Sequence, residues 1–181
     1  GYTVVSLIKF WCPITFEAVT HDCAEWNREL IDYLLTIKPA AVVTNTTQVD
    51  SGQLEKQTPG VEDFIGTLTA AGVDVIGFRD VPRMPWDPAA CLETRSQEAC
   101  EVPSRGIYTD NAMNADLTSA ARRPGTFHPV DIAPYFCPDG HCPSLIGNVY
   151  LYIDGAHVTQ TYVRTLVPAV DEQLRASGWR W

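Results

Sequence analysis

The chain has 181 residues, of which 45% are hydrophobic and 19% charged, a composition that fits one globular domain and excludes a disordered or fibrous protein. Its 22 acidic and 13 basic residues give a net charge of -9, which repels phosphate backbones, so nucleic acid is not an expected partner. No apolar run approaches the ~20 residues of a membrane span. We therefore expect a single domain over residues 1–181.

Hydrophobic periodicity predicts strands that alternate with helices along the chain. Residues 2–8 are rich in β-branched side chains and predict a strand. A helix is expected from about Asp22, whose spacing from Glu25 matches a capping box, to Lys38-Pro39. The later predicted elements are a strand at 40–44, a polar loop at 48–57, a helix from Thr58-Pro59 to Gly72, a strand at 73–78, a Pro-rich excursion at 79–105, a helix at 111–122, strands at 127–132 and 149–153, and a helix at 159–176 kinked by Pro168.

This alternation predicts an α/β fold with a parallel sheet covered on both faces by helices. In such sheets, ligands bind beyond the carboxyl ends of the strands. Chemistry is therefore expected at residues 44–45, 78–80 and 153–157, each of which follows a predicted strand.

The six cysteines fall into three closely spaced pairs, and each pair is flanked by loop-like residues. Local pairing predicts three short-range disulfides and an oxidising compartment. The alternative is a zinc site at Cys137, His141 and Cys142, but the crowding of these ligands and the lack of an evident fourth one argue against a metal. The predicted disulfides are Cys12–Cys23, Cys91–Cys100 and Cys137–Cys142.

Asp154 and His157 are the most informative pair of residues, because they stand three apart between a predicted strand and the last helix. At this spacing the carboxylate can fold back onto Nδ1 of the imidazole. That contact fixes the tautomer and leaves Nε2 able to take a proton from a nucleophile. Alternatively, Asp154 caps the helix and His157 is an ordinary loop residue.

The block from Asp154 to Thr159 resembles the last block of SGNH hydrolases, and more narrowly that of the SGNH domain fused to bacterial membrane acyltransferases of the acyltransferase-three family. The order of further motifs along nearly the whole chain strengthens the resemblance. These motifs are Leu7-Ile-Lys9 before Cys12-Pro13, Cys23 before Trp26 and Asn27, Phe78-Arg-Asp80-Val-Pro82, Cys137-Pro138, Cys142-Pro143, Tyr162, Leu166 and Pro168.

The resemblance implies a three-layer αβα sandwich with a Ser-His-Asp triad, in which Asp154 orients His157 and His157 activates a serine. That serine would carry an acyl group from a donor to a glycan acceptor or to water, and the chemistry needs no cofactor. The resemblance also implies a partner, the membrane acyltransferase domain of the same protein, and an extracytoplasmic location. The alternative is a glycan-binding or structural module without catalysis.

The family's nucleophile lies in a Gly-Asp-Ser motif, and this sequence contains none. The nearest imitation, Asp50-Ser51-Gly52, falls in a polar loop after a later strand. In the family the nucleophile block directly precedes the strand that residues 2–8 resemble, so the serine and one central strand are expected upstream of Gly1. A separate segment or a truncated chain would account for this, and a degenerate, non-catalytic relative is the remaining interpretation.

Two further residues are candidates for the site. Asn45 follows a predicted strand, where its amide could donate to a developing oxyanion, although it could equally be a turn residue at the strand end. Arg79 could hold an anionic or sugar group, and the alternative is a structural pair with Asp80 that anchors the Pro-rich loop.

Overall fold

The structure is a computed structural model that describes residues 1–15, 17, 20–109, 117–123 and 126–180. Its helices are α1 (His21–Ile37), α2 (Val61–Ala70), α3 (Pro88–Thr94), α5 (Ala133–Phe136), α6 (Gln160–Thr165) and α7 (Val167–Ala176). Its strands are β1 (Ala41–Asn45), β2 (Thr47–Gln48), β3 (Lys56–Gln57), β4 (Asp74–Phe78), β5 (Val102–Pro103), β6 (Phe127–Val130), β7 (His141–Cys142), β8 (Leu145–Ile146) and β9 (Val149–Tyr150). Short 3-10 helices cover Glu98–Cys100, Ser104–Gly106, Leu117–Ala120 and Pro138–Gly140.

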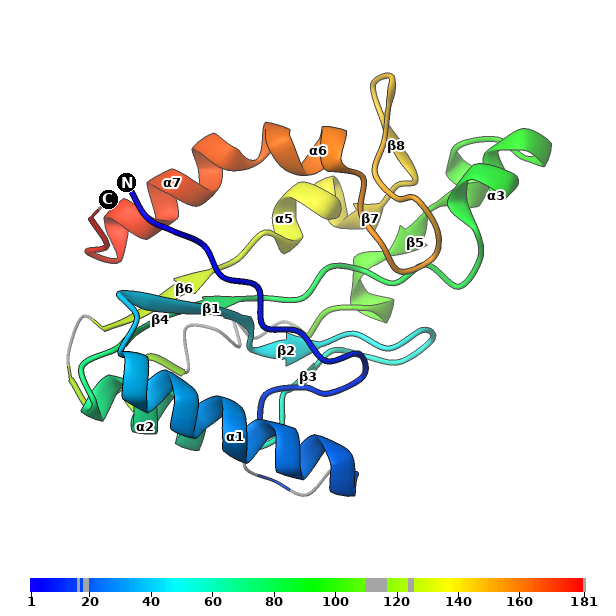
Figure 1. The fold of residues 1–181 in the computed structure, drawn as a ribbon. Coiled ribbons are helices and arrows are strands. Elements are labelled where there is room, and N and C mark those ends of the chain that lie inside the picture. Colours follow the sequence, from blue (N-terminus) through cyan, green and yellow to red (C-terminus); the bar gives the residue numbers. More distant parts are fainter. Residues whose placement is uncertain (16, 18–19, 110–116, 124–125, 181) are drawn as a thin grey trace.

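The central sheet has the strand order β1-β4-β6, and both pairings are parallel. Helices α1 and α2 cover one face of the sheet and α7 covers the other, as Figure 1 shows. Because β1, β4 and β6 are joined through helices or long excursions, they can pair in parallel as the alternating pattern predicted. The three-layer α/β architecture is thereby confirmed.

A separate apolar core fills each side of the sheet. The first lies against α1 and α2 and includes Leu34, Phe64 and Val75, all of them buried. The second lies against α7 and joins Ile76 of β4 to Leu174. Consecutive residues of β4 thus point into opposite cores, which is the period-2 alternation of a strand that is buried on both faces.

Residues 2–8 do not form the predicted strand. They carry no strand pairing, and their side chains are mostly exposed, including Val4 and Val5. The β-branched composition favours extended backbone, but a strand also needs a neighbour with which to exchange hydrogen bonds. Among the described residues no strand pairs with this segment, so that neighbour is absent.

The predicted strand at 149–153 is also wrong in its extent and in its place. Only Val149–Tyr150 is a strand, and it pairs antiparallel with Leu145–Ile146 in a small hairpin outside the central sheet. A tight turn at Gly147, where φ is +58°, reverses the chain, so that Val149–Tyr150 pairs with the preceding strand and not with the central sheet. Half of the predicted helix at 111–122, residues 111–116, lies outside the described residues, and Leu117–Ala120 in the other half is a 3-10 helix.

Two helix boundaries show how local chemistry sets the elements. Thr20, rather than Asp22, caps α1, because its hydroxyl accepts a hydrogen bond from the Cys23 amide. The C-terminal helix is broken in two at Leu166, where α7 begins with Pro168 in its first turn. This confirms the predicted effect of the proline on that helix.

Candidate active site

The loop between Tyr152 and Val158 brings the Asp154 carboxylate onto the imidazole of His157. The Oδ2 atom of Asp154 lies 2.9 Å from Nδ1 of His157, and Oδ1 lies 3.1 Å from it. The same Oδ1 accepts hydrogen bonds from the backbone amides of Ala156, at 2.7 Å, and His157, at 2.8 Å. A bridge between Tyr152 and Val158 closes the loop at its base. The carboxylate therefore shapes the loop and orients the ring together.

This geometry fixes the charge of the carboxylate and the tautomer of the ring. The Ala156 amide, followed by the His157 side chain, lowers the pKa of the Asp154 carboxyl to about 2. An ionised carboxylate only accepts hydrogen bonds, so Nδ1 of His157 carries the proton and Nε2 presents its lone pair. The His157 side chain is 74% exposed, which leaves Nε2 open to an approaching group.

A second contact fastens this loop to the segment that follows β4. The backbone amide of Met84 donates a hydrogen bond of 2.8 Å to the carbonyl of Gly155. A Cβ atom at Gly155 would lie 2.9 Å from the Met84 carbonyl oxygen and 3.2 Å from that of Trp86. The sequence pattern did not reveal this contact, because Gly155 looks like an ordinary turn residue until its neighbours are known.

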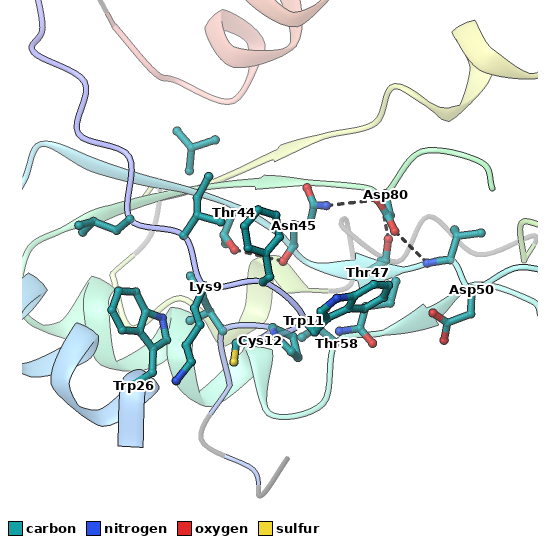
Figure 2. Close-up of a pocket in the computed structure, with 18 of the residues that line it drawn as sticks. Lys9, Trp11, Cys12, Trp26, Thr44, Asn45, Thr47, Asp50, Thr58 and Asp80 are labelled. Atoms are coloured by element: carbon teal, nitrogen blue, oxygen red, sulfur yellow. Dashed lines mark hydrogen bonds between the residues drawn. The ribbon is translucent and has the colours of Figure 1, made fainter. Parts of the chain in front are cut away.

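Asn45 lies at the carboxyl end of β1, and its side chain joins a polar network around Asp80. The Nδ2 atom of Asn45 donates a hydrogen bond of 3.2 Å to Oδ1 of Asp80. The backbone amides of Val49 and Val81 also donate to this buried carboxyl, which Figure 2 shows beside the strand ends. Burial raises the pKa of Asp80, and the amide hydrogen bonds oppose that rise. Asn45 is thus held in place by one of its two amide hydrogens.

Arg79 is buried in an ion-pair network that the sequence did not predict. Its guanidinium forms hydrogen bonds of 2.8 and 2.6 Å to the two carboxylate oxygens of Glu55, and one of 3.1 Å to Asp131. It also donates to the Thr109 carbonyl and lies 4.6 Å from the centre of the Tyr108 ring. The partner of Arg79 is therefore Glu55 rather than the adjacent Asp80, and a substrate contact for Arg79 stays a prediction.

A cavity of about 690 Å³ opens beside these strand ends. Residues 7–14 line it on one side, residues 43–45 and 47–50 on the other, and Asp80 and Arg83 also line it. Figure 2 shows Asn45 and Thr47 on one side and Trp11 on the other. Asn45 is therefore the predicted site residue that faces this space, and His157 is not among its lining residues.

The three predicted disulfides are all present and account for every cysteine of the chain. The bond between Cys137 and Cys142 rules out the alternative in which both are zinc ligands. Within the described residues, no group of three or more His, Cys, Asp or Glu side chains is placed to hold a metal ion.

None of the seven serines, all in the described part of the chain, is hydrogen-bonded to His157. Ser51 is exposed in the loop between β2 and β3, and Ser144 donates to the Cys100 carbonyl. Ser177 pairs with a different histidine, His128, at 2.9 Å. The geometry thus supplies an acid–base pair without a nucleophile beside it.

Comparison with known proteins agrees with these observations. The family model of the SGNH domain fused to AT3 (acyltransferase-three) domains matches residues 1–172. The chain belongs to this family. The chain also shares its fold with the solved periplasmic domain of the lipopolysaccharide acetyltransferase of Salmonella ser. Paratyphi A, with a TM-score of 0.52 and 13% sequence identity. The match covers 84% of this chain and 63% of that one.

No curated protein matches the chain significantly. Among the described residues, no helix is long and apolar enough to cross a membrane. The family description names fusion to AT3 domains, so a membrane acyltransferase domain is the partner domain that is typical of the family.

Proposed function

We propose that this chain is part of an extracytoplasmic serine O-acyltransferase or esterase that acts on cell-envelope glycans. The observation that carries the proposal is the ionised Asp154 carboxylate on Nδ1 of His157, which leaves Nε2 as an exposed base. Membership of the SGNH family supports it, as does the fold shared with a periplasmic lipopolysaccharide acetyltransferase domain. The three disulfides fit an oxidising compartment.

In the proposed mechanism the nucleophile is a serine upstream of Gly1. Nε2 of His157 takes the proton of the serine hydroxyl as its oxygen attacks the acyl carbonyl carbon of the donor. The carbonyl oxygen becomes an oxyanion, and the second amide hydrogen of Asn45 donates to it. The donor's leaving group then departs with the proton from His157, and an acyl-serine remains.

The second half of the reaction repeats these roles with the glycan acceptor. His157 removes a proton from a sugar hydroxyl, or from water in an esterase, and the new oxygen nucleophile attacks the acyl-serine. Collapse of the second tetrahedral intermediate returns the proton to the serine and releases the acylated glycan. Throughout, Asp154 stays ionised and stabilises the imidazolium that forms in each half-reaction.

The test is covalent labelling of the full-length protein with a fluorophosphonate, which reacts with an activated serine. We expect labelling in the parent protein and its loss in His157→Ala. His21→Ala is the matched control, because His21 is an exposed histidine on α1. Labelling that survives in a folded His157→Ala protein, or its absence from the parent protein, would contradict the proposal.

A second candidate is a glycan-binding module that has lost catalysis. The observation in its favour is that no serine within residues 1–181 lies at hydrogen-bond distance from His157. This alternative predicts that the native gene encodes no upstream Gly-Asp-Ser motif and that glycan binding is unchanged in His157→Ala. Binding of envelope glycan to both proteins, measured by isothermal titration calorimetry, separates the two candidates.

A further inference from the structure

Two adjacent aromatic residues are exposed where the cavity opens. Phe10 and Trp11 are 87% and 92% exposed, and both line the cavity beside the strand ends. Trp179, by contrast, is packed into the core and only 7% exposed. A single exposed apolar residue needs no explanation, but neighbouring aromatic residues at a cavity are typical of a surface that binds a ligand.

The backbone of Trp11 has a conformation that is rare for an aromatic residue. Residues 9–12 form a turn, which a hydrogen bond of 3.2 Å from the Cys12 amide to the Lys9 carbonyl closes. Trp11 takes the third position of this turn with a φ of +61°, where glycine or asparagine is the usual residue. The Nζ atom of Lys9 donates to the carbonyl of Asp22 on α1 and so helps to hold the turn. Strained backbone of this kind clusters at sites that bind ligands.

The side of the cavity across from Trp11 is polar, as Figure 2 shows. Hydroxyl, amide and carboxylate side chains line it, from Thr44, Asn45, Thr47, Gln48 and Asp50. Arg83 lines it as well, and its Nε atom has no hydrogen-bond partner among the described residues. An aromatic face opposite a set of hydrogen-bonding groups complements a sugar ring, because the ring has apolar C–H faces and carries hydroxyl groups at its edge.

We propose that Trp11 is the platform on which a sugar ring of the acceptor glycan stacks, and that it determines the enzyme's specificity for that ring. This inference rests on the proposed function, because it places the acceptor in the cavity that Asn45 faces. A ring stacked on the indole would present its hydroxyl groups to the polar side of the cavity. There one hydroxyl would meet the acyl group, next to the amide assigned to the oxyanion.

The charges of the molecule favour a sugar over other ligands of an exposed tryptophan. Nucleic acid bases also stack on aromatic rings, but the net charge of -9 repels their phosphates. The charged residues that line the cavity balance one another, two acidic against two basic: Asp50 and Asp80, and Lys9 and Arg83. A neutral ring rich in hydroxyl groups suits this lining, whereas a lipid chain would bury the polar side without hydrogen-bond partners.

The experiment measures how tightly the full-length protein binds soluble fragments of its own organism's envelope polysaccharide, by isothermal titration calorimetry. Trp11→Gly removes the ring, and glycine favours the positive φ of this turn. Trp11→Phe keeps an aromatic face. Tyr33→Ala on α1 is the control, because Tyr33 is 46% exposed and is not among the lining residues of the cavity. We expect W11G to bind at least about tenfold more weakly than the unmodified protein, W11F within about threefold of it, and Y33A equally well.

Equal affinities of W11G and the unmodified protein would overturn the proposal, and so would a folded unmodified protein that binds no fragment. Equal weakening in W11G and W11F would also overturn it, because the aromatic face would then not matter. A W11G protein that melts well below Y33A while its glycan affinity is unchanged would show that polypeptide covers Trp11, which contradicts a sugar platform. Should W11G fail to fold, Trp11→Asn takes its place, since asparagine also tolerates a left-handed backbone.

Fluorophosphonate labelling separates this result from the test of the proposed function. A protein that binds the fragments through Trp11 and does not react with fluorophosphonate would keep the platform and lose the acyl transfer. A protein that reacts with fluorophosphonate and binds the fragments equally well without Trp11 would keep the proposed function and lose the platform.

Discussion

Replacing Gly155 by alanine should disturb the Asp154–His157 pair without touching either side chain. The added methyl group would lie 2.9 Å from the Met84 carbonyl oxygen and 3.2 Å from that of Trp86. Both obstacles are backbone atoms, so the loop itself must move by a few tenths of an ångström. That shift weakens the 2.8 Å hydrogen bond from the Met84 amide to residue 155.

The magnitude follows from these contacts. Loss of the backbone hydrogen bond costs about 0.5–1.5 kcal/mol, and the steric displacement adds a similar amount, so the free energy of unfolding should fall by about 1–3 kcal/mol. Catalytic groups tolerate displacement poorly, and a shift of about 1 Å can cost about 100-fold in rate. We therefore expect fluorophosphonate labelling of the full-length protein to slow by about 10-fold.

Two assays and one control test this reasoning. Urea denaturation gives the stability change, and nitrogen chemical shifts of the His157 imidazole report whether Nδ1 still carries the shared proton. Gly106→Ala is the control, because a Cβ at Gly106 meets no atom within 4 Å and its φ is not positive. If the Gly155→Ala protein matches the control in stability and in the His157 spectrum, the Met84 contact does not position the loop.

Three other predictions follow from the contacts already described. The Asp154 carboxyl should titrate near pH 2, below its ordinary value of 3.8, so its contribution to stability is present above pH 4 and is lost as the pH falls toward 2; a carbon NMR titration checks this, and the midpoint should rise in His157→Ala. Arg79→Met should destabilise the protein by about 3–5 kcal/mol in urea, because it leaves the buried Glu55 carboxylate without its partner, whereas Arg175→Met at an exposed ion pair should leave the urea midpoint nearly unchanged. Gly77→Ala should lower the melting temperature at a cost of about 1–3 kcal/mol, because its Cβ would lie 2.6 Å from the aromatic ring at the start of β6, and an unchanged melting temperature would contradict that packing.

The parts of the site that could be predicted from the sequence are those held together by short-range contacts. Asp154 and His157 are three residues apart in one loop, so the local fold of that loop is enough to bring the carboxylate onto the imidazole. Each disulfide likewise closes a short loop. Helices α1 and α2 were predictable because their apolar residues recur with the helical period and pack on one core.

The parts that could not be predicted depend on partners far along the chain. Arg79 pairs with Glu55 and Asp131, which are 24 and 52 residues away, and nothing in the local pattern distinguishes these carboxylates from the adjacent Asp80. Residues 2–8 have the composition of a strand, yet pairing is a property of the neighbour as well as of the segment. The Val149–Tyr150 strand was misplaced for a different reason: its partner is the adjacent hairpin arm Leu145–Ile146, whereas the helix–strand alternation had assigned it to the central sheet.

The disulfide between Cys12 and Cys23 has a consequence for the way in which the cavity is built. Cys12 lines the cavity and Cys23 is buried in α1, so the bond fixes the outer wall covalently to the helical layer. Asn27 of α1 reinforces the attachment by donating hydrogen bonds to the carbonyls of Pro13 and Thr15. The wall is therefore preorganised, so binding in the cavity does not bear the entropy cost of ordering it. Reducing this one bond should therefore loosen the wall, although among the residues that line the cavity only Cys12 changes chemically.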